Sequence, residues 1–341
     1  MRSFLKPAAG LTCVFALALA GCSAGSGDSS GKDSTPSRQT SSTPSGGGSS
    51  STSYAPYVSV ETASGNDSAG SPTTYNLAFA IAGGSACTPE WNGTTAIGDS
   101  AVTARIAKLR SSGASVRVSF GGASGKELAE TCSDASTLAK AYGAALDAAG
   151  STQADFDIEG AALTDSASVT LRSEAIALLQ KERTGLKVSF TLPVMPSGLD
   201  SDSLALLESA NDKGVRVSTV NLMTMNYGAS YSGDMGDYAI TAATAAHTQL
   251  KKVFGLSDAG AWRGMALTSM IGVNDVAGET FSLSDAAQVR TFAEEKEIAW
   301  VSIWSSFRDQ QCGTGSTDDD AATDCSGVAQ SAGAFGEAFA G

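Results

Sequence analysis

Three carboxylates recur at alternate positions in a short stretch near the middle of the chain, ADFDIEG, which supplies Asp155, Asp157 and Glu159. Alternate side chains of a β-strand point to the same face, so the acids share one face and apolar residues occupy the other. Acidic residues are depleted in strands, and three of them in a poorly solvated interior cannot all ionise at low cost. At least one is therefore expected to hold a proton near neutral pH, as a general acid must.

Metal binding and a purely structural role are the alternatives for this stretch. A metal site needs oxygen ligands that converge from several elements, whereas alternate positions of one strand lie roughly 6.6 Å apart. A solvated edge strand would not carry Phe156 and Ile158 on its other face. Zinc is disfavoured as well, because the chain has a single histidine and no pair of cysteines in CxxC spacing. We therefore favour catalysis.

From Tyr54 onward, short β-rich runs alternate with amphipathic helical stretches. The expected strands are Tyr57–Thr62, Tyr75–Ile81, Ser115–Phe120, Gln153–Glu159, Lys187–Pro193, Val217–Met225, Met265–Ile271 and Ala299–Trp304. The expected helices lie around Ala101–Arg110, Ala135–Ala148, Ser168–Lys181, Ser203–Asn211, Tyr238–Phe254, Asp285–Lys296 and Gly327–Phe339. Because this alternation implies parallel strands joined by crossovers, and because no GxGxxG follows the first strand, we predict an α/β fold of the closed (β/α)8 TIM barrel type.

Active sites of such barrels are built at the carboxyl ends of the strands. Gly121 and Gly122 end the third expected strand, where paired glycines would let the backbone approach a ligand closely. The other residues singled out at strand ends are Met225, Asn226, Tyr227 and Trp304. Together with the acids, these residues would form a sugar-sized pocket with an aromatic floor.

These segments together resemble glycoside hydrolase family 18, in its bacterial chitinase-like branch. The resemblance rests on SFGG after the third strand, DFDIE on the fourth, MTMNYG on the sixth and a tryptophan that closes the eighth, and it covers most of residues 54–341. It implies that Glu159 donates a proton to the glycosidic oxygen, that Asp157 orients the 2-acetamido group of the substrate and that Asp155 shares charge with Asp157. The sugar-binding residues that it implies are Asn226, Tyr227 and Trp304, with Met225 beside them.

The resemblance further implies hydrolysis of β-1,4 linkages in N-acetylglucosamine polymers such as chitin. The expected action is endo and retaining, with an oxazolinium formed by the acetamido group of the substrate, and no metal or other cofactor is implied. The chain departs from the family pattern at two places. Thr152 and Gln153 stand where the family has Asp and Gly, and Asn226 stands where it has Asp. We expect these departures to alter the rate and the pH optimum more than the type of reaction.

Two other functions remain open. The first is an endo-β-N-acetylglucosaminidase that cuts glycans or peptidoglycan, since these substrates also present an acetamido group at the reacting sugar. The second is a lectin-like barrel that binds chitin or other glycans but turns them over weakly. The intact Glu159 favours the enzyme.

The first residues of the chain are typical of an exported lipoprotein. Residues 1–21 combine a basic start with a short apolar run, and the run ends in LAGC, which resembles a lipobox with Cys22 as the lipidated residue. Residues 22–53 are rich in Ser, Gly and Thr and are expected to form a disordered tether, so that the catalytic domain comprises residues 54–341. We expect a monomer that is exported and held outside the cytoplasm on the cell membrane by its lipid, or secreted.

The net charge bears on the binding partners of the protein, and its cysteines bear on whether it is exported. The formal net charge of −13 argues against nucleic acid as a partner. Four cysteines remain beyond Cys22, and an even number in an exported domain indicates two disulfides. The simplest pairing is Cys87 with Cys132 and Cys312 with Cys325, although four cysteines allow three pairings.

Overall fold

The computed structural model describes residues 52–316 and 324–341 of the chain. The predicted signal peptide, Cys22 and nearly all of the predicted tether lie outside the described residues. The fold begins just before the predicted boundary, since the first strand includes Ser53, the last residue that we assigned to the tether.

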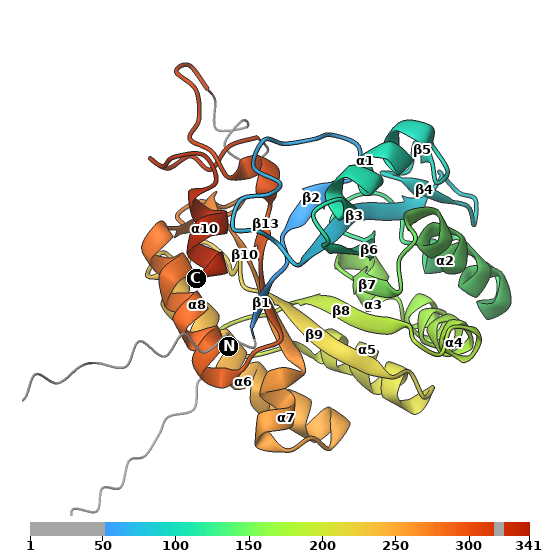
Figure 1. Ribbon diagram of the computed structural model, residues 1–341. Coiled ribbons are helices and arrows are strands. Elements are labelled where there is room, and N and C mark those ends of the chain that lie inside the picture. Colours follow the sequence, from blue (N-terminus) through green and yellow to red (C-terminus); the bar gives the residue numbers. More distant parts are fainter. Residues whose placement is uncertain (1–51, 317–323) are drawn as a thin grey trace, which may run out of the picture. The chain divides into compact units, whose positions relative to one another are not determined.

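Parallel strands form a closed ring in the described part of the chain (Figure 1). In order around the ring these are β1 (Ser53–Tyr54) with β2 (Tyr57–Ser59), then β3 (Thr74–Ala82), β6 (Ser115–Gly121), β7 (Gln153–Asp157), β8 (Lys187–Pro193), β9 (Val217–Met223), β10 (Met265–Met270) and β13 (Trp300–Trp304). The first strand is split, and its halves pair with different neighbours: Ser53 lies opposite Trp300 of β13, and Tyr57 lies opposite Asn76 of β3. Pro56 lies at the break, where its missing N–H costs no ladder bond. The split strand closes the ring, which confirms the predicted TIM barrel.

Helices surround the strands (Figure 1). They are α1 (Ser100–Arg110), α2 (Ala135–Ala149), α3 (Gly160–Thr164), α4 (Ser166–Glu182), α5 (Ser201–Asp212), α6 (Met235–Phe254), α7 (Asp258–Arg263), α8 (Leu283–Lys296) and α10 (Ala334–Ala340), with 3-10 turns at η1 (Leu128–Glu130) and η2 (Ser306–Arg308). An aspartate side chain caps the first turn of α1, α2, α4, α5 and α6, and each such cap stabilises a helix by about 1 kcal/mol. The caps account for part of the excess of acidic residues in the sequence.

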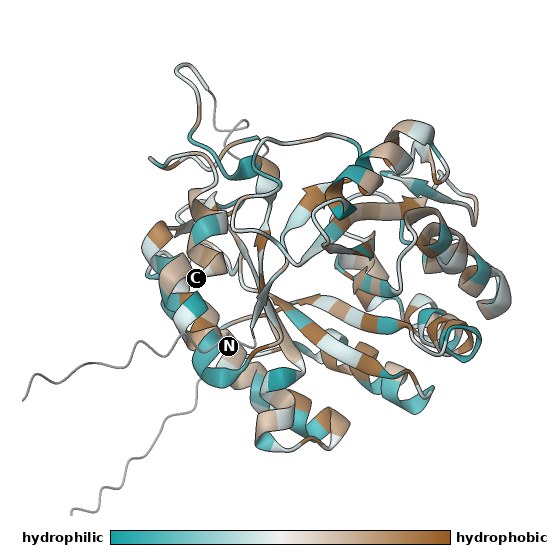
Figure 2. Ribbon diagram, in the orientation of Figure 1, coloured by the Kyte–Doolittle hydropathy of each residue, from teal (hydrophilic) through white to brown (hydrophobic). Residues whose placement is uncertain are grey.

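Aromatic residues pack between the strands and the helices and fix which face of β7 points inward. Phe120, Phe156 and Phe190 lie in register on β6, β7 and β8, with ring centroids 5.2 and 5.7 Å apart in succession. Tyr142 of α2 packs edge-on against Phe156 at 5.0 Å. Figure 2 shows apolar residues recurring along the strands of the ring and on its surrounding helices. Because Phe156 faces the helices, Asp155 and Asp157 point into the barrel, as predicted.

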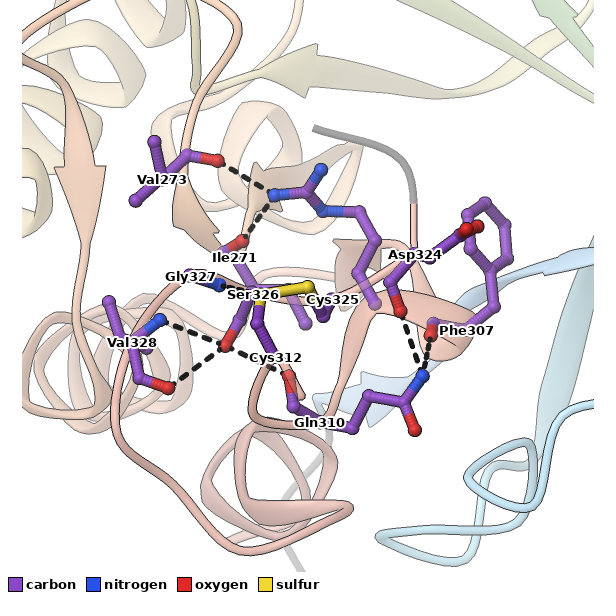
Figure 3. The surroundings of a disulfide bond; sticks show 11 residues. Ile271, Val273, Phe307, Gln310, Cys312, Asp324, Cys325, Ser326, Gly327 and Val328 are labelled. Atoms are coloured by element: carbon purple, nitrogen blue, oxygen red, sulfur yellow. Dashed lines mark hydrogen bonds between the residues drawn. A yellow bond between two sulfur atoms is a disulfide. The ribbon is translucent and has the colours of Figure 1, made fainter. Parts of the chain in front are cut away.

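Short additional strands lie at the carboxyl ends of the ring strands. The pair β4 (Pro89–Trp91) and β5 (Thr95–Ala96) extends β3, and β11 (Gly272–Val273) pairs with β12 (Thr280–Phe281) after β10. Two disulfides, Cys87–Cys132 and Cys312–Cys325, confirm the simplest predicted pairing. Figure 3 shows the second of them. Within residues 52–316 and 324–341, no helix is both long and apolar enough to cross a membrane.

Candidate active site

Asp155 is the centre of a buried hydroxyl cluster inside the barrel. Its Oδ2 accepts hydrogen bonds from Tyr57 at 2.8 Å and Ser119 at 2.7 Å, and its Oδ1 accepts from Ser189 at 2.6 Å and Thr191 at 2.8 Å. Ser119 and Ser189 are its register partners on the two neighbouring strands, so the parallel pairing brings them together. Four donors satisfy both oxygens, and Asp155 thereby supplies a fixed negative charge beneath the site.

The cluster extends across the barrel through Asn221 of β9. The Nδ2 of Asn221 donates to Thr191 at 3.0 Å and to the Tyr57 hydroxyl at 3.3 Å, and its Oδ1 accepts from Thr268 at 2.9 Å. Burial, followed by the charge of Asp155, raises the pKa of Tyr57 well above its ordinary value, so this hydroxyl stays a donor. A satisfied polar network of this kind orients its members rigidly.

Asp157 lies one step above Asp155 at the end of β7 and is only 6 % exposed. Its Oδ1 is buried and has no hydrogen-bond partner among the described residues. Burial raises the pKa of Asp157 well above 3.8, and the charges of Glu159 and Asp155 raise it further. An unpartnered, protonatable oxygen in such a position is suited to bind a polar group of a ligand.

Glu159 follows the end of β7 and begins α3 in an extended backbone conformation, with φ −133° and ψ 167°. The predicted strand included Glu159, whereas β7 ends at Asp157. Its side chain makes no capping bond to α3 and is half-buried at the rim of the barrel. Burial, and then the charge of Asp275, raise the pKa of Glu159 above its ordinary value, which favours the proton donor expected from the sequence.

A pocket of about 530 Å³ opens above these acids at the carboxyl ends of the strands. Phe79 and Trp304 stack at 5.6 Å with an angle of 26° between their rings, and Tyr57 meets Trp304 edge-on at 5.9 Å. The pocket is lined by Tyr57, Phe79, Ile81, Asn92, Ala123, Ser124, Gly125, Asp157, Glu159, Thr191, Met223, Met225, Asn226, Thr268, Asp275 and Trp304. The volume and the flat aromatic side suit a sugar ring.

The structure brings together most of the sequence-predicted residues. Asp157, Glu159, Met225, Asn226 and Trp304 line one pocket, with Asp155 beneath them. Among residues 52–316 and 324–341, no group of three or more His, Cys, Asp and Glu side chains is arranged to hold a metal ion.

Tyr227 is not among the residues that line the pocket. It is 4 % exposed and packs against Tyr231 at 5.9 Å and Tyr238 at 6.0 Å. The preceding residue, Asn226, has a φ of 54°, and this left-handed turn directs Asn226 to the pocket and Tyr227 into the tyrosine cluster. Of these two residues expected to bind the sugar, Asn226 lines the pocket and Tyr227 does not.

Gly121 and Gly122 also lie outside the lining of the pocket. Both have positive φ, 96° and 91°. A Cβ on Gly121 would overlap the carbonyl oxygen of Asp157, and one on Gly122 would lie 3.0 Å from the ring of Phe79. The glycine pair therefore lets the end of β6 pack against the backbone of Asp157.

Sequence reasoning missed several lining residues. Thr191 carried a usable signal, since Ser189 and Thr191 alternate along β8 as Asp155 and Asp157 do along β7. Phe79 lies beside an irregularity in the pairing of β3, between Leu77 and Ala80, which periodicity does not foresee. The missed residues that matter most for the chemistry are Tyr57, Phe79, Thr191 and Asp275.

The chain is similar in sequence to two curated chitinases. No family model matches the chain. A probable bifunctional chitinase/lysozyme of Escherichia coli (strain K12) is 35 % identical over 280 residues, which are 76 % of this chain and 31 % of that protein. Endochitinase 11 of Metarhizium anisopliae is 37 % identical over 218 residues, which are 60 % of this chain and 42 % of that protein. The chain thus spans less than half the length of each of these curated relatives.

A solved structure matches over a larger share of its own length. The catalytic domain of a hyperthermophilic chitinase from Pyrococcus furiosus is 31 % identical, with a TM-score of 0.74, over 84 % of this chain and 93 % of that chain. The likeness therefore includes the whole barrel and not an isolated motif.

Proposed function

Because the chain belongs to glycoside hydrolase family 18, we propose that it hydrolyses the β-1,4 linkages of N-acetylglucosamine polymers, with chitin as its substrate. The observation that carries the proposal is the pairing of Asp157 and Glu159 in one pocket beside Trp304. The relatives' names, chitinase/lysozyme, endochitinase and chitinase, support it.

In the proposed reaction, Glu159 protonates the glycosidic oxygen while the acetamido oxygen of the bound sugar attacks the anomeric carbon. The bond to the leaving sugar breaks, and an oxazolinium forms without a covalent bond to the protein. Water, deprotonated by Glu159, then opens the oxazolinium with net retention. A second carboxylate facing the anomeric carbon is not required by this scheme.

Asp157 is proposed to hold the acetamido group. Its unpartnered Oδ1 can accept a hydrogen bond from the acetamido N–H, which would hold the acetamido oxygen against the anomeric carbon in a largely dry site. Asp155 stays beneath it as an oriented negative charge held by four hydroxyl groups. Trp304 and Phe79 would pack against the apolar face of the sugar.

The test is hydrolysis of chitin oligosaccharides by the full chain and by its Glu159→Gln variant. We expect the substitution to reduce kcat by about 100-fold or more while binding is retained, because it removes the acid but little volume. Asp202→Asn, an exposed change on α5 outside the pocket, is the matched control. If the unmodified chain binds the oligosaccharides without cleaving them, it is a lectin-like barrel. Proton NMR of fresh product should show the β-anomer first.

Endo action is proposed from the short connection between β10 and β13, which contains only the β11–β12 hairpin and α8. With no inserted domain in this connection, long chains can lie across the site at internal positions. Early release of oligosaccharides of mixed length from chitin would support endo action, whereas release of a single short product from the first turnover would contradict it.

Peptidoglycan is a second candidate substrate, because the E. coli relative is named a bifunctional chitinase/lysozyme. Both polymers present an acetamido group at the reacting sugar. Rates on chitin and on purified peptidoglycan, measured side by side, separate the two substrates.

We also propose that the protein acts outside the cytoplasm as a monomer tethered through a lipid on Cys22. The LAGC sequence and the Ser- and Gly-rich segment that follows it support this location. Radiolabelled fatty acid should be incorporated by the chain and not by its Cys22→Ala variant.

A further inference from the structure

The β11–β12 hairpin carries two carboxylates whose side chains point in different directions. The turn between its strands contains Asp275 and Glu279. Asn274 fixes the start of the turn, because its Nδ2 donates to the carbonyls of Met270 at 2.9 Å and Gly272 at 3.0 Å. The backbone N–H of Asn274 donates to the carbonyl of Glu279 at 3.1 Å, which closes the turn.

Glu279 points away from the pocket to the loop that follows β9. It is 1 % exposed, and its Oε1 accepts the backbone N–H of Gly228 at 2.7 Å. The backbone N–H groups of Asn226 and Tyr227 also act on this carboxylate, and they oppose the rise in its pKa that burial causes. Glu279 thereby holds Asn226 in its left-handed conformation at the rim.

Asp275 points into the pocket that Glu159 and Asp157 share. The Nδ2 of Asn226 donates to its Oδ2 at 3.4 Å, so the hairpin and the loop after β9 meet at these two side chains. Asn226 itself is uncharged. Asp275 therefore supplies a negative charge at this side of the pocket, where Asn226, in the loop after β9, supplies none.

Hydrogen bonds from Arg308 and to Ser326 hold the base of the hairpin in place. The guanidinium of Arg308 donates to the carbonyls of Ile271 at 3.0 Å and Val273 at 2.7 Å, and the N–H of Val273 donates to the carbonyl of Ser326 at 2.7 Å. Ser326 directly follows Cys325 of the second disulfide. Figure 3 shows the hydrogen bonds that the carbonyls of Ile271 and Val273 accept from one guanidinium group. Such clamping allows an exposed side chain on the turn to keep a defined place.

We propose that Asp275 is a fourth carboxylate of the active site, a positioning residue that acts through Glu159 and Asn226. Its negative charge keeps Glu159 in the acid form from which a proton can be donated, and its hydrogen bond aims the Asn226 amide into the pocket. This inference rests on the proposed glycosidase function and adds a residue that lies neither in the DFDIE segment nor at the end of a barrel strand.

The charges around Glu159 come from several elements. Asp157 and Asp155 lie on β7, Asp275 lies on the hairpin and Arg308 lies in η2. The Tyr57 hydroxyl stays neutral, since its pKa is raised by burial. Burial lowers the pKa of Arg308 to about 10, while Asp275 acts in the opposite direction. Since Asp275 is exposed, salt should screen its effect on Glu159.

The test compares Asp275→Asn with the unmodified chain, with Asp275→Glu as a charge-retaining variant and Asp202→Asn as a charge-removing control elsewhere. The alkaline limb of the pH profile of kcat/KM should move to lower pH by about half to one unit in Asp275→Asn, because a partly screened negative charge has been removed. The movement should shrink at high salt. Asp275→Glu should restore the limb, and Asp202→Asn should leave it unchanged.

Carbon-13 NMR titration of the Glu159 carboxyl gives the same answer without turnover. A lower Glu159 pKa in Asp275→Asn supports the role of Asp275 even if the chain cleaves no substrate. A lack of cleavage would contradict only the proposed glycosidase function. An unchanged Glu159 pKa overturns the proposal, and a loss of rate with no shift of the alkaline limb does so too. Failure of the proposed role of Asp275 and failure of the proposed glycosidase function therefore give different results.

Discussion

Gly121 packs directly against the carbonyl oxygen of Asp157, and no side chain fits between them. The next residue, Gly122, donates its backbone N–H to the same oxygen at 2.9 Å. The carboxylate that we assign to the acetamido group is therefore positioned through its own backbone by the end of the neighbouring strand.

Replacing Gly121 by alanine should damage both stability and rate. The positive φ and the overlap with Asp157 should together cost roughly 2–4 kcal/mol of unfolding free energy. Displacement of Asp157 should lower kcat on the order of 100-fold. Gly185→Ala is the control, since no atom lies within 4 Å of its added Cβ. Urea unfolding that gives equal stabilities for the two variants would contradict this account.

Asp157→Asn should stabilise the fold at neutral pH while abolishing activity. The folded protein raises the pKa of Asp157 well above 3.8, so the folded state keeps a proton that the unfolded state releases. The proton on Asp157 therefore contributes to the unfolding free energy fully below about pH 3.8, and this contribution is lost as pH rises through the folded-state pKa. The loss amounts to about 1.4 kcal/mol for each unit by which folding raises the pKa. Asparagine does not ionise, so the variant should melt higher than the unmodified chain at pH 7. The difference should vanish near pH 4, and a constant difference between these pH values would rule out titration as its cause.

Asp155→Ala should be strongly destabilising. It would leave four buried hydroxyl groups without their acceptor, at a cost of roughly 3–5 kcal/mol. Ser119→Ala removes one donor and should cost about 1–2 kcal/mol, since three donors remain. Asp155→Asn keeps one acceptor oxygen, so its loss of unfolding free energy should lie between those of Ser119→Ala and Asp155→Ala. Denaturant midpoints should follow this order, and the reverse order would argue against the cluster as a stabilising unit.

The two disulfides should have separable effects. Cys87 and Cys132 are 45 residues apart and Cys312 and Cys325 are 13 apart, so loop entropy predicts about 4 and about 3 kcal/mol of stabilisation. Paired serine variants at Cys87 and Cys132 should therefore lose more stability. Paired serine variants at Cys312 and Cys325 should lose more activity, because Ser326 supports the hairpin that carries Asp275. Thermal unfolding and kcat/KM, measured on both variants, decide this.

The sequence contained enough information to predict the barrel and the acidic strand. Asp155, Asp157 and Glu159 were accessible because a strand has a strict period of two, and Phe156 indicated which face is buried. Tyr227 was assigned to the pocket because it ends a strand, but one left-handed residue before it reverses its direction. Local patterns do not reveal such a turn.

Asp275 could not have been found in this way. Its place depends on a hairpin whose base is held by Arg308 and Ser326, residues 33 and more positions further along the chain. Contacts of this range are set by tertiary packing and leave no periodic trace in the sequence. The acids were easily predicted because they follow a regular strand, whereas Phe79 lies at an irregular strand pairing and Asp275 lies on a turn.

The split first strand has a consequence for how the molecule is made. Ser53 pairs with Trp300, so the ring joins segments from nearly opposite ends of the fold. During synthesis, β1 has no partner on that side until β13 has left the ribosome. The pairing of β1 with β13, which closes the ring, therefore forms late. Pairing between segments so far apart in sequence is also intrinsically slow. The active site is therefore enclosed on all sides only after β13 has been synthesised and has paired with β1.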